Sequence, residues 1–137
     1  GRLTMPSKWR TELSSQVVVT RGLDGCLSIF PYAKFEEIEK QIDTQGIMLA
    51  ETRLWARYMI GAADAIEVDV QGRVLIQQKL REYANLNGNV VVVGLVSRIE
   101  VWNPEKFKAI SEQVESDAVA VSQKMGEMMV SIANSVK

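Results

Sequence analysis

The chain of 137 residues contains no histidine and only one cysteine. It therefore lacks the most common catalytic base and the most common transition-metal ligand, and Cys26 alone cannot form a disulfide within the chain. No apolar run approaches the roughly 18 residues that span a membrane. No basic start precedes a long apolar run, as it would in a signal peptide. We therefore expect a soluble, cytoplasmic globular protein without a cofactor or a bound metal.

Arrangements typical of an active site are also missing. The carboxylates that could act as acid and base fall on predicted turns or on a solvated helix face, without an apolar pocket to shift their pKa values. They are Asp24, Asp43, Glu36 and Glu37. Cys26 lies on a predicted strand and is best interpreted as a small core residue. The sequence thus predicts a protein that is not an enzyme and has no small-molecule substrate.

One cationic pattern occurs twice. Residues 1–10 read GRLTMPSKWR and residues 72–81 read GRVLIQQKLR, and the two windows align without a gap. Neither window contains an acid, although the formal net charge of the chain is −1. The matched cations are Arg2, Lys8 and Arg10 in the first window and Arg73, Lys79 and Arg81 in the second. A single such run is usually a solvated face, but two runs with identical spacing favour a functional surface.

The order of the predicted elements repeats as well. Each copy contains a turn with Gly-Arg, a strand, a short helix ending in Arg, a valine-rich strand, a hairpin, a proline and a helix with Phe. We expect one α+β fold of two pseudo-symmetric β-barrel-like halves with attached helices. The predicted parts are a first half at 1–45 that lacks its N-terminal strand, a linking helix at 46–63, a second half at 64–108 and a C-terminal helix at 109–137.

Local patterns predict the individual elements. Asp24-Gly25 is a strong hairpin signal between the β-branched run 16–20 and its partner strand 26–30. The alternating run 65–69 should be followed by a turn and by the return strand 73–76. Further strands are expected at 3–5, 89–93 and 98–102, and short helices at 7–13 and 77–83. The three tryptophans are expected to face the core rather than stack on nucleobases; they are Trp9, Trp55 and Trp102.

The tail has a different pattern. Its apolar residues alternate in steps of four and three, the a and d spacing of a helix that presents one seam to a partner helix. They are Val114, Ala118, Val121, Met125, Met128 and Ile132. Gly126 weakens such a helix. We expect the seam to pack within the same subunit or against a neighbouring subunit, rather than to form a free coiled coil.

The repeated cations suggest contact with DNA. A turn would present Arg2 or Arg73 at a hairpin tip, where a guanidinium can contact guanine O6 and N7 or a phosphate in bidentate fashion. The lysine and arginine of the adjoining short helix would hold the phosphate backbone. Asp69 precedes Arg73 by four residues and could pair with one arginine and orient it; its alternative role is that of an ordinary turn residue.

The pattern at 69–81, together with its counterpart at 1–10, resembles the SpoVT-AbrB swapped-hairpin family. Two copies in one chain, with the segments 20–27, 61–63 and 93–102, resemble in particular a bacterial member of that family. The first copy differs from the family pattern because the strand and the aspartate that should precede Gly1 are absent. In the second copy, Gln77 stands where the family prefers proline.

The resemblance implies a DNA-binding transcriptional regulator of the cell division and cell wall gene cluster. It implies binding of double-stranded promoter DNA at direct G-rich repeats, assembly into a ring of identical subunits, an octamer or a dodecamer, and association with the nucleoid. It places the DNA contacts on Arg2 and Arg73 and the helix-end arginines on Arg10 and Arg81, while Lys8 and Lys79 follow from the spacing. The alternative is a protein-interaction module, because AbrB-like folds also serve as antidotes that neutralise a partner protein.

Overall fold

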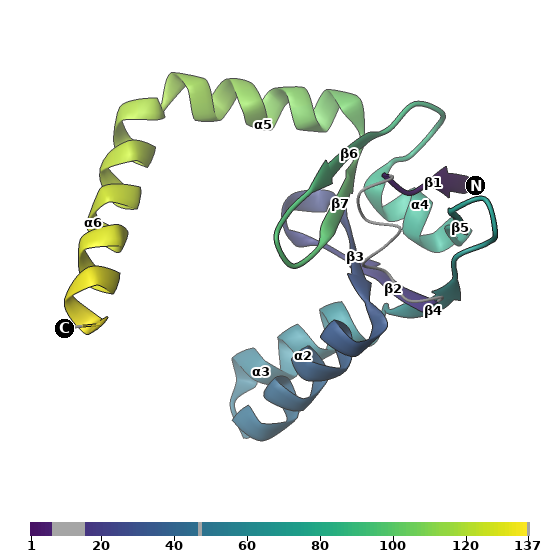
Figure 1. Cartoon of the computed structure of the whole chain (residues 1–137), viewed down its shortest axis with the longest axis horizontal. Helices are drawn as coiled ribbons and strands as arrows, with labels where there is room; N and C mark the ends of the chain where they lie inside the picture. Colours follow the sequence, from purple (N-terminus) through teal and green to yellow (C-terminus); the bar gives the residue numbers. More distant parts are fainter. Residues whose placement is uncertain (7–15, 47, 137) are drawn as a thin grey trace. The chain divides into compact units, whose positions relative to one another are not determined.

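The computed structural model describes residues 1–6, 16–46 and 48–136. The chain divides into two units, which are described separately: residues 1–103 contain the strands, and residues 104–137 contain two helices (Figure 1). Trp9 and the helix predicted at 7–13 lie outside the described residues. The mixed content of antiparallel sheets and helices confirms the α+β class. The swapped-hairpin arrangement and the boundaries of the two halves stay predictions.

The first hairpin forms as its turn signal predicts. Strand β2 (Gln16–Arg21) pairs antiparallel with β3 (Leu27–Pro31), and the 3-10 turn η1 (Leu23–Gly25) joins them. Asp24 and Gly25 have φ angles of 65° and 85°, positive values that aspartate and glycine adopt more readily than most residues. Pro31 ends β3 and precedes helix α2 (Tyr32–Gln45). The predicted hairpin and its boundary at Pro31 are therefore confirmed.

Strands from both copies share one antiparallel sheet. Its order is β4 (Asp64–Glu67), β2, β3, β7 (Ile99–Trp102) and β6 (Val91–Gly94). A separate two-stranded sheet joins β1 (Arg2–Thr4) to β5 (Arg73–Leu75). The predicted return of 73–76 along 65–69 is wrong, because β4 pairs with β2 and β5 pairs with β1. Alternation determines which face of a strand is buried, but it does not determine the neighbouring strand.

Both faces of the central strands β2 and β3 are buried. The side chains of a strand alternate between its two faces, so neighbours on β2 enter different apolar clusters. Val17 and Val19 pack in a cluster with Leu80 of helix α4 (Gln78–Ala84), whereas Val18 packs with Phe35 of α2. Cys26 and Trp102 are also buried. The core roles predicted for these two residues are therefore confirmed.

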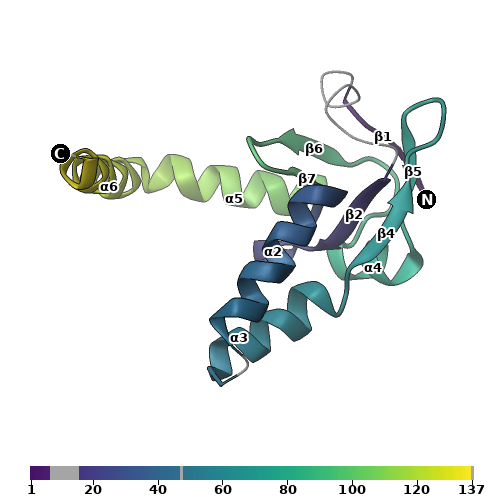
Figure 2. The same ribbon diagram turned by 60° about the horizontal axis from the view of Figure 1, so that its bottom comes forward.

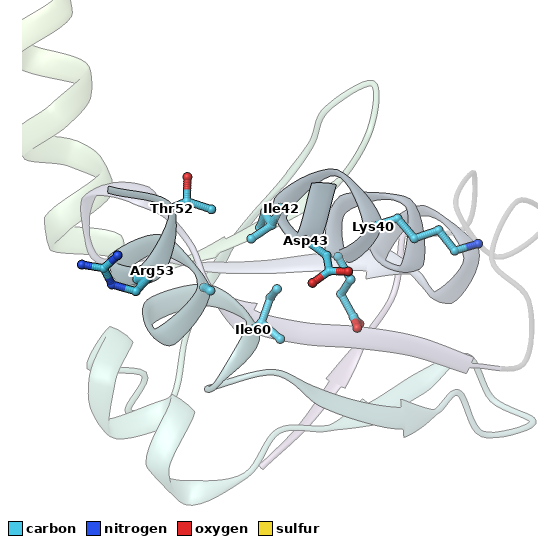
Figure 3. A pocket seen from close by; sticks show the side chains of 8 residues that line it. Lys40, Ile42, Asp43, Thr52, Arg53 and Ile60 are labelled. Atoms are coloured by element: carbon cyan, nitrogen blue, oxygen red, sulfur yellow. The ribbon is translucent and has the colours of Figure 1, made fainter. Parts of the chain in front are cut away.

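The link between the copies is helical. Helix α3 (Ala50–Trp55) continues into the π-helical turn η2 (Ala56–Ile60), and α2 and α3 lie side by side as they extend from the sheet (Figures 1 and 2). A depression of about 360 Å³ lies between them. Figure 3 shows Ile42 and Ile60 within it, while Lys40 and Arg53 point away at its opposite ends. Its two long cations therefore do not converge on a common point.

The second unit consists of α5 (Pro104–Ser116) and α6 (Ala118–Val136). The predicted C-terminal helix is thus interrupted at Asp117. Along the predicted seam, Val121 is 40% exposed, and Val114, Met125 and Met128 are each 48% exposed. The side chain of Ile132 lies outside the described residues. What packs on this seam stays a prediction. Among the described residues, no helix combines the length and the apolar character needed to cross a membrane.

Candidate nucleic-acid interface

The two cationic stretches meet in the two-stranded sheet of β1 and β5, which we call the ribbon. In its register Arg2 lies opposite Leu75, Leu3 opposite Val74 and Thr4 opposite Arg73. Val74 is buried and Leu3 is half-buried, so the central pair faces the core. The outer face then carries Arg2, Thr4, Arg73 and Leu75.

This register relates the two copies by a pseudo-twofold axis. A shift of 71 positions converts Arg2 into Arg73, because 73 − 2 = 71, and it converts Leu3 into Val74. The axis passes between Leu3 and Val74, which are directly opposite each other. The arginines of the two copies are therefore diagonal neighbours on one face of the ribbon.

One carboxylate holds both arginines. Asp69 Oδ2 lies 3.3 Å from Arg2 Nη1 and 3.1 Å from Arg73 Nε. Asp69 Oδ1 accepts hydrogen bonds from the backbone N–H groups of Gln71 and Arg73, each at 2.9 Å. The N–H groups of Arg73 and Gln71 and the Arg73 guanidinium lower the pKa of the Asp69 carboxyl. Asp69 thus forms an ion pair with an arginine of each copy, while the orienting role predicted for it stays a prediction.

The geometry leaves hydrogen-bond donors available on the outer face. Arg73 uses Nε toward Asp69, so neither of its terminal amino groups forms an ion pair among the described residues. Arg2 instead uses Nη1, which occupies part of its terminal fork. Arg73 is 38% exposed and Arg2 is 56% exposed. Because two terminal amino groups are needed for an end-on bidentate contact, Arg73 is the better presented of the two.

The turn before β5 explains how Asp69 reaches this position. Gly72 has a φ of 76°, which favours glycine, and its N–H donates to the Asp69 carbonyl at 2.9 Å. The Asp69 N–H donates in turn to the Arg73 carbonyl at 2.9 Å. These two bonds close the turn and direct the carboxylate toward the ribbon. Asp69 is thus fixed by its backbone as well as by its side chain.

The remaining predicted cations separate. Arg81 Nε donates to the Ile76 carbonyl at 3.1 Å, and Arg81 lines a depression of about 270 Å³ together with Gly1 and Arg2. The structure therefore brings Arg81 of one copy to Arg2 of the other. Lys79 is exposed and lines a different depression. Lys8 and Arg10 lie outside the described residues.

Sequence reasoning did not select two further cations, Arg21 and Arg57, which line the same depression as Lys79. Arg21 ends a valine-rich strand and Arg57 lies in the linking helix, and neither belongs to a run of three cations like the two repeated windows. The sequence offered one signal for this depression: segment 20–27, which contains Arg21, and segment 61–63, which lines the depression, both contribute to the family resemblance. Among the described residues, no group of three or more cysteine, aspartate or glutamate side chains could hold a metal ion.

Fold and site together define an α+β protein in which two copies of one unit combine their arginines on a shared β-ribbon. Comparison with known proteins identifies the family. The chain matches the family model described as "MraZ protein, putative antitoxin-like" over residues 1–57 and 59–127. The chain therefore belongs to the MraZ family. This is the two-copy bacterial family that the order of its segments resembles.

Named relatives support the same assignment. A protein from Roseiflexus castenholzii named Transcriptional regulator MraZ is 38% identical over 128 residues, covering 93% of this chain and 90% of the relative. The protein of the same name from Clostridium acetobutylicum is 35% identical over 128 residues, covering 93% of this chain and 89% of the relative. That from Saccharopolyspora erythraea is 37% identical over 117 residues, covering 85% and 82%. The shared name describes a regulator rather than an enzyme, in line with the prediction from sequence.

Proposed function

We propose that this protein is a transcriptional regulator that binds double-stranded DNA through the ribbon. The observation that carries the proposal is the pair of arginines, one from each copy, held side by side by Asp69. The major groove of DNA accommodates a two-stranded β-ribbon, and an arginine is the most frequent reader of guanine O6 and N7. The names of the relatives support a role in transcription.

The finer features of the proposal come from the family resemblance. The target is the promoter of the cell division and cell wall gene cluster, read as direct G-rich repeats, and the protein is associated with the nucleoid. In this proposal residues 1–45 and 64–108 form equivalent halves, 46–63 joins them, and 109–137 contributes to assembly. A ring-shaped homo-oligomer, an octamer or a dodecamer, would present many ribbons to repeated boxes, so weak individual contacts combine into useful affinity.

The other cations would hold the DNA backbone. Arg81 lines a depression together with Arg2, which supports a contact of Arg81 with a phosphate next to the bases that the ribbon reads. Lys79 is exposed on the first turn of α4 and contributes charge at a second position. Lys8 and Arg10 are proposed to act in the same way in the first copy. These contacts give affinity without sequence information, and they make binding sensitive to salt.

The test is binding to the protein's own upstream DNA, measured by fluorescence anisotropy across a salt series. We expect a linear fall of log K with log salt, and a loss of affinity in Arg2→Ala and Arg73→Ala. Lys40→Ala is the matched control, because Lys40 lies on α2 outside the ribbon. Sedimentation should show the same assembly for all variants. Unchanged affinity in both arginine variants would refute the assignment of the ribbon.

A second candidate function is a protein-interaction module that neutralises a partner protein. It is favoured by the antitoxin-like description of the family and by the half-exposed apolar residues along the second unit. This candidate predicts that the wild-type chain has no affinity for its upstream DNA that depends on sequence. Competition with unrelated DNA of the same length therefore separates the two functions.

A further inference from the structure

A second cationic site lies away from the outer face of the ribbon. A depression of about 340 Å³ is lined by residues from the end of β2, from η2 and the three residues that follow it, from the start of β4 and from the start of α4. Its charged lining consists of three cations, Arg21, Arg57 and Lys79, and one carboxylate, Asp64. Among the described residues, none of these three cations forms an ion pair. The depression therefore holds an excess of positive charge that the chain itself does not neutralise.

Arg21 is held in place by aromatic rings. Its guanidinium carbon lies 5.3 Å from the centre of the Tyr58 ring and 5.4 Å from the centre of the Tyr83 ring. A cation over an aromatic face is attracted by the ring, but it keeps its full charge and its hydrogen-bond donors. Arg21 is thus oriented without being neutralised. Arg21 can therefore still bind an anion through its charge and its hydrogen-bond donors.

The two tyrosines are fixed in turn. One hydroxyl donates to the other, which leaves one hydroxyl proton for the Gly22 carbonyl, 3.4 Å from the Tyr58 hydroxyl and 3.3 Å from the Tyr83 hydroxyl. Burial and the hydrogen bond with Tyr58 raise the pKa of Tyr83, which keeps it neutral near pH 7. A Cβ at Gly22 would lie 2.6 Å from Cys26 Sγ, so only glycine allows this close approach. The support of Arg21 is therefore built by residues from three segments.

Arg57 lies on a π-helical turn that requires glycine. The Gly61 N–H donates to the Ala56 carbonyl at 3.0 Å, and a Cβ at Gly61 would lie 2.6 Å from the Arg57 carbonyl oxygen. Ala62 and Ala63 follow and also line the depression. Small side chains at these three positions leave open the space into which the cations reach. π-Helical turns of this kind are frequent at functional sites.

We propose that this depression binds the phosphate group of a phosphate ester. Two guanidinium groups and an ammonium group offer several donors to the oxygens of one phosphate, and guanidinium geometry matches phosphate in bidentate contacts. With three cations and one carboxylate, the site keeps an excess of two positive charges (3 − 1 = 2). The segments 20–27 and 61–63, which the ribbon does not use, converge on this site. The phosphate comes either from the DNA backbone, in which case the inference rests on the proposed function, or from a free nucleotide.

The first arm of the test uses free ligands without DNA. Inorganic phosphate and deoxyadenosine monophosphate are titrated against the full chain by isothermal titration calorimetry. Arg57→Gln and Lys79→Gln alter exposed side chains, so both variants are expected to fold. Lys40→Gln on α2 is the control of equal charge change. If the source is a free nucleotide, binding weakens at least about tenfold in both site variants and is unchanged in the control.

The second arm measures the salt dependence of DNA binding. If the source is the DNA backbone, the slope of log K against log salt falls by about 1 in each site variant, as expected for one lost phosphate contact. The base preference stays unchanged in these variants. Wild-type behaviour of both variants in both arms overturns the proposal. If the wild-type chain binds no DNA, the proposed function fails and the free-ligand arm alone decides, with absence of binding there overturning this inference as well.

Discussion

Replacing Arg73 by lysine tests whether DNA binding depends on the planar guanidinium group or only on its positive charge. Arg73 contacts Asp69 through Nε, so its two terminal amino groups, the planar fork of the guanidinium, form no ion pair among the described residues. Lysine retains one positive charge near the same place, but it has no fork for the paired acceptors O6 and N7 of guanine. If the ribbon reads guanine, Arg73→Lys should lose affinity for the specific site and keep its salt dependence.

The expected magnitude follows from this geometry. A bidentate arginine–guanine contact contributes about 1–3 kcal/mol of discrimination, which corresponds to a loss of about 5- to 150-fold in affinity. Arg2 already directs Nη1 toward Asp69, so Arg2→Lys should lie near the lower end of this range. Non-specific binding should change by less than about twofold in both variants, because the charge is preserved.

The assay is competition anisotropy with the upstream DNA and with DNA in which single guanines are replaced by adenine. For Arg73→Lys, one guanine replacement should no longer weaken binding further, which identifies the base that this arginine contacts. Lys40→Arg on α2 serves as the reciprocal control. Wild-type affinity of Arg73→Lys for the specific site would refute base reading by this fork and leave only contact with phosphate.

Three further predictions concern single residues. Because the pKa of Asp69 is lowered below its ordinary value of 3.8, its carboxylate stabilises the fold above that pH, and this contribution is lost as the pH falls through the folded pKa. The Tm difference between wild type and Asp69→Asn should therefore be constant between about pH 7 and 5 and become smaller as the pH falls below 3.8; a difference that does not decrease in acid contradicts it. Gly61→Ala should cost about 1–3 kcal/mol in urea unfolding, because its Cβ would meet the Arg57 carbonyl. Gly126→Ala in α6 should instead stabilise its helix, because a Cβ there would meet open space. If Gly61→Ala and Gly126→Ala changed the free energy of unfolding equally, the predicted clash at Gly61 would be refuted. Burial, helped by the Glu100 carboxylate, raises the pKa of the Cys26 thiol to about 12, so a thiol-reactive disulfide should label it at pH 8 only after unfolding, and rapid labelling of the folded chain would contradict this.

The sequence predicted those elements that depend on residues close together in the chain, such as the first hairpin and the helix α4. The Asp24-Gly25 pair is a turn signal, and both residues have positive φ in the hairpin that forms there. The run 77–83 places Leu80 on the inner face of a short helix, and Leu80 is buried in α4. These predictions succeed because the alternation of apolar residues and the conformations allowed to glycine act within a few residues.

Contacts between distant segments were not predictable in the same way. The run 73–76 is a good strand in sequence, but nothing in it distinguishes 65–69 from residues 2–4 as its partner. The grouping of Arg21, Arg57 and Lys79 likewise depends on three elements far apart in the chain. A search for cationic runs finds neighbours in sequence, so it selected Lys79 without the two arginines that share its depression.

The pairing of β1 with β5 changes what the repeated motif means. Each cationic window alone supplies one arginine to a strand of three residues, and an isolated strand of that length is not stable. Paired across the copies, the two strands bury Val74 and place both arginines on one face. The aspartate of the second copy then forms an ion pair with the arginine of the first. In the function that we propose, the unit that reads DNA is therefore the ribbon and not the single motif. The strand register, and not the length of the chain between the two arginines, then sets the distance between Arg2 and Arg73.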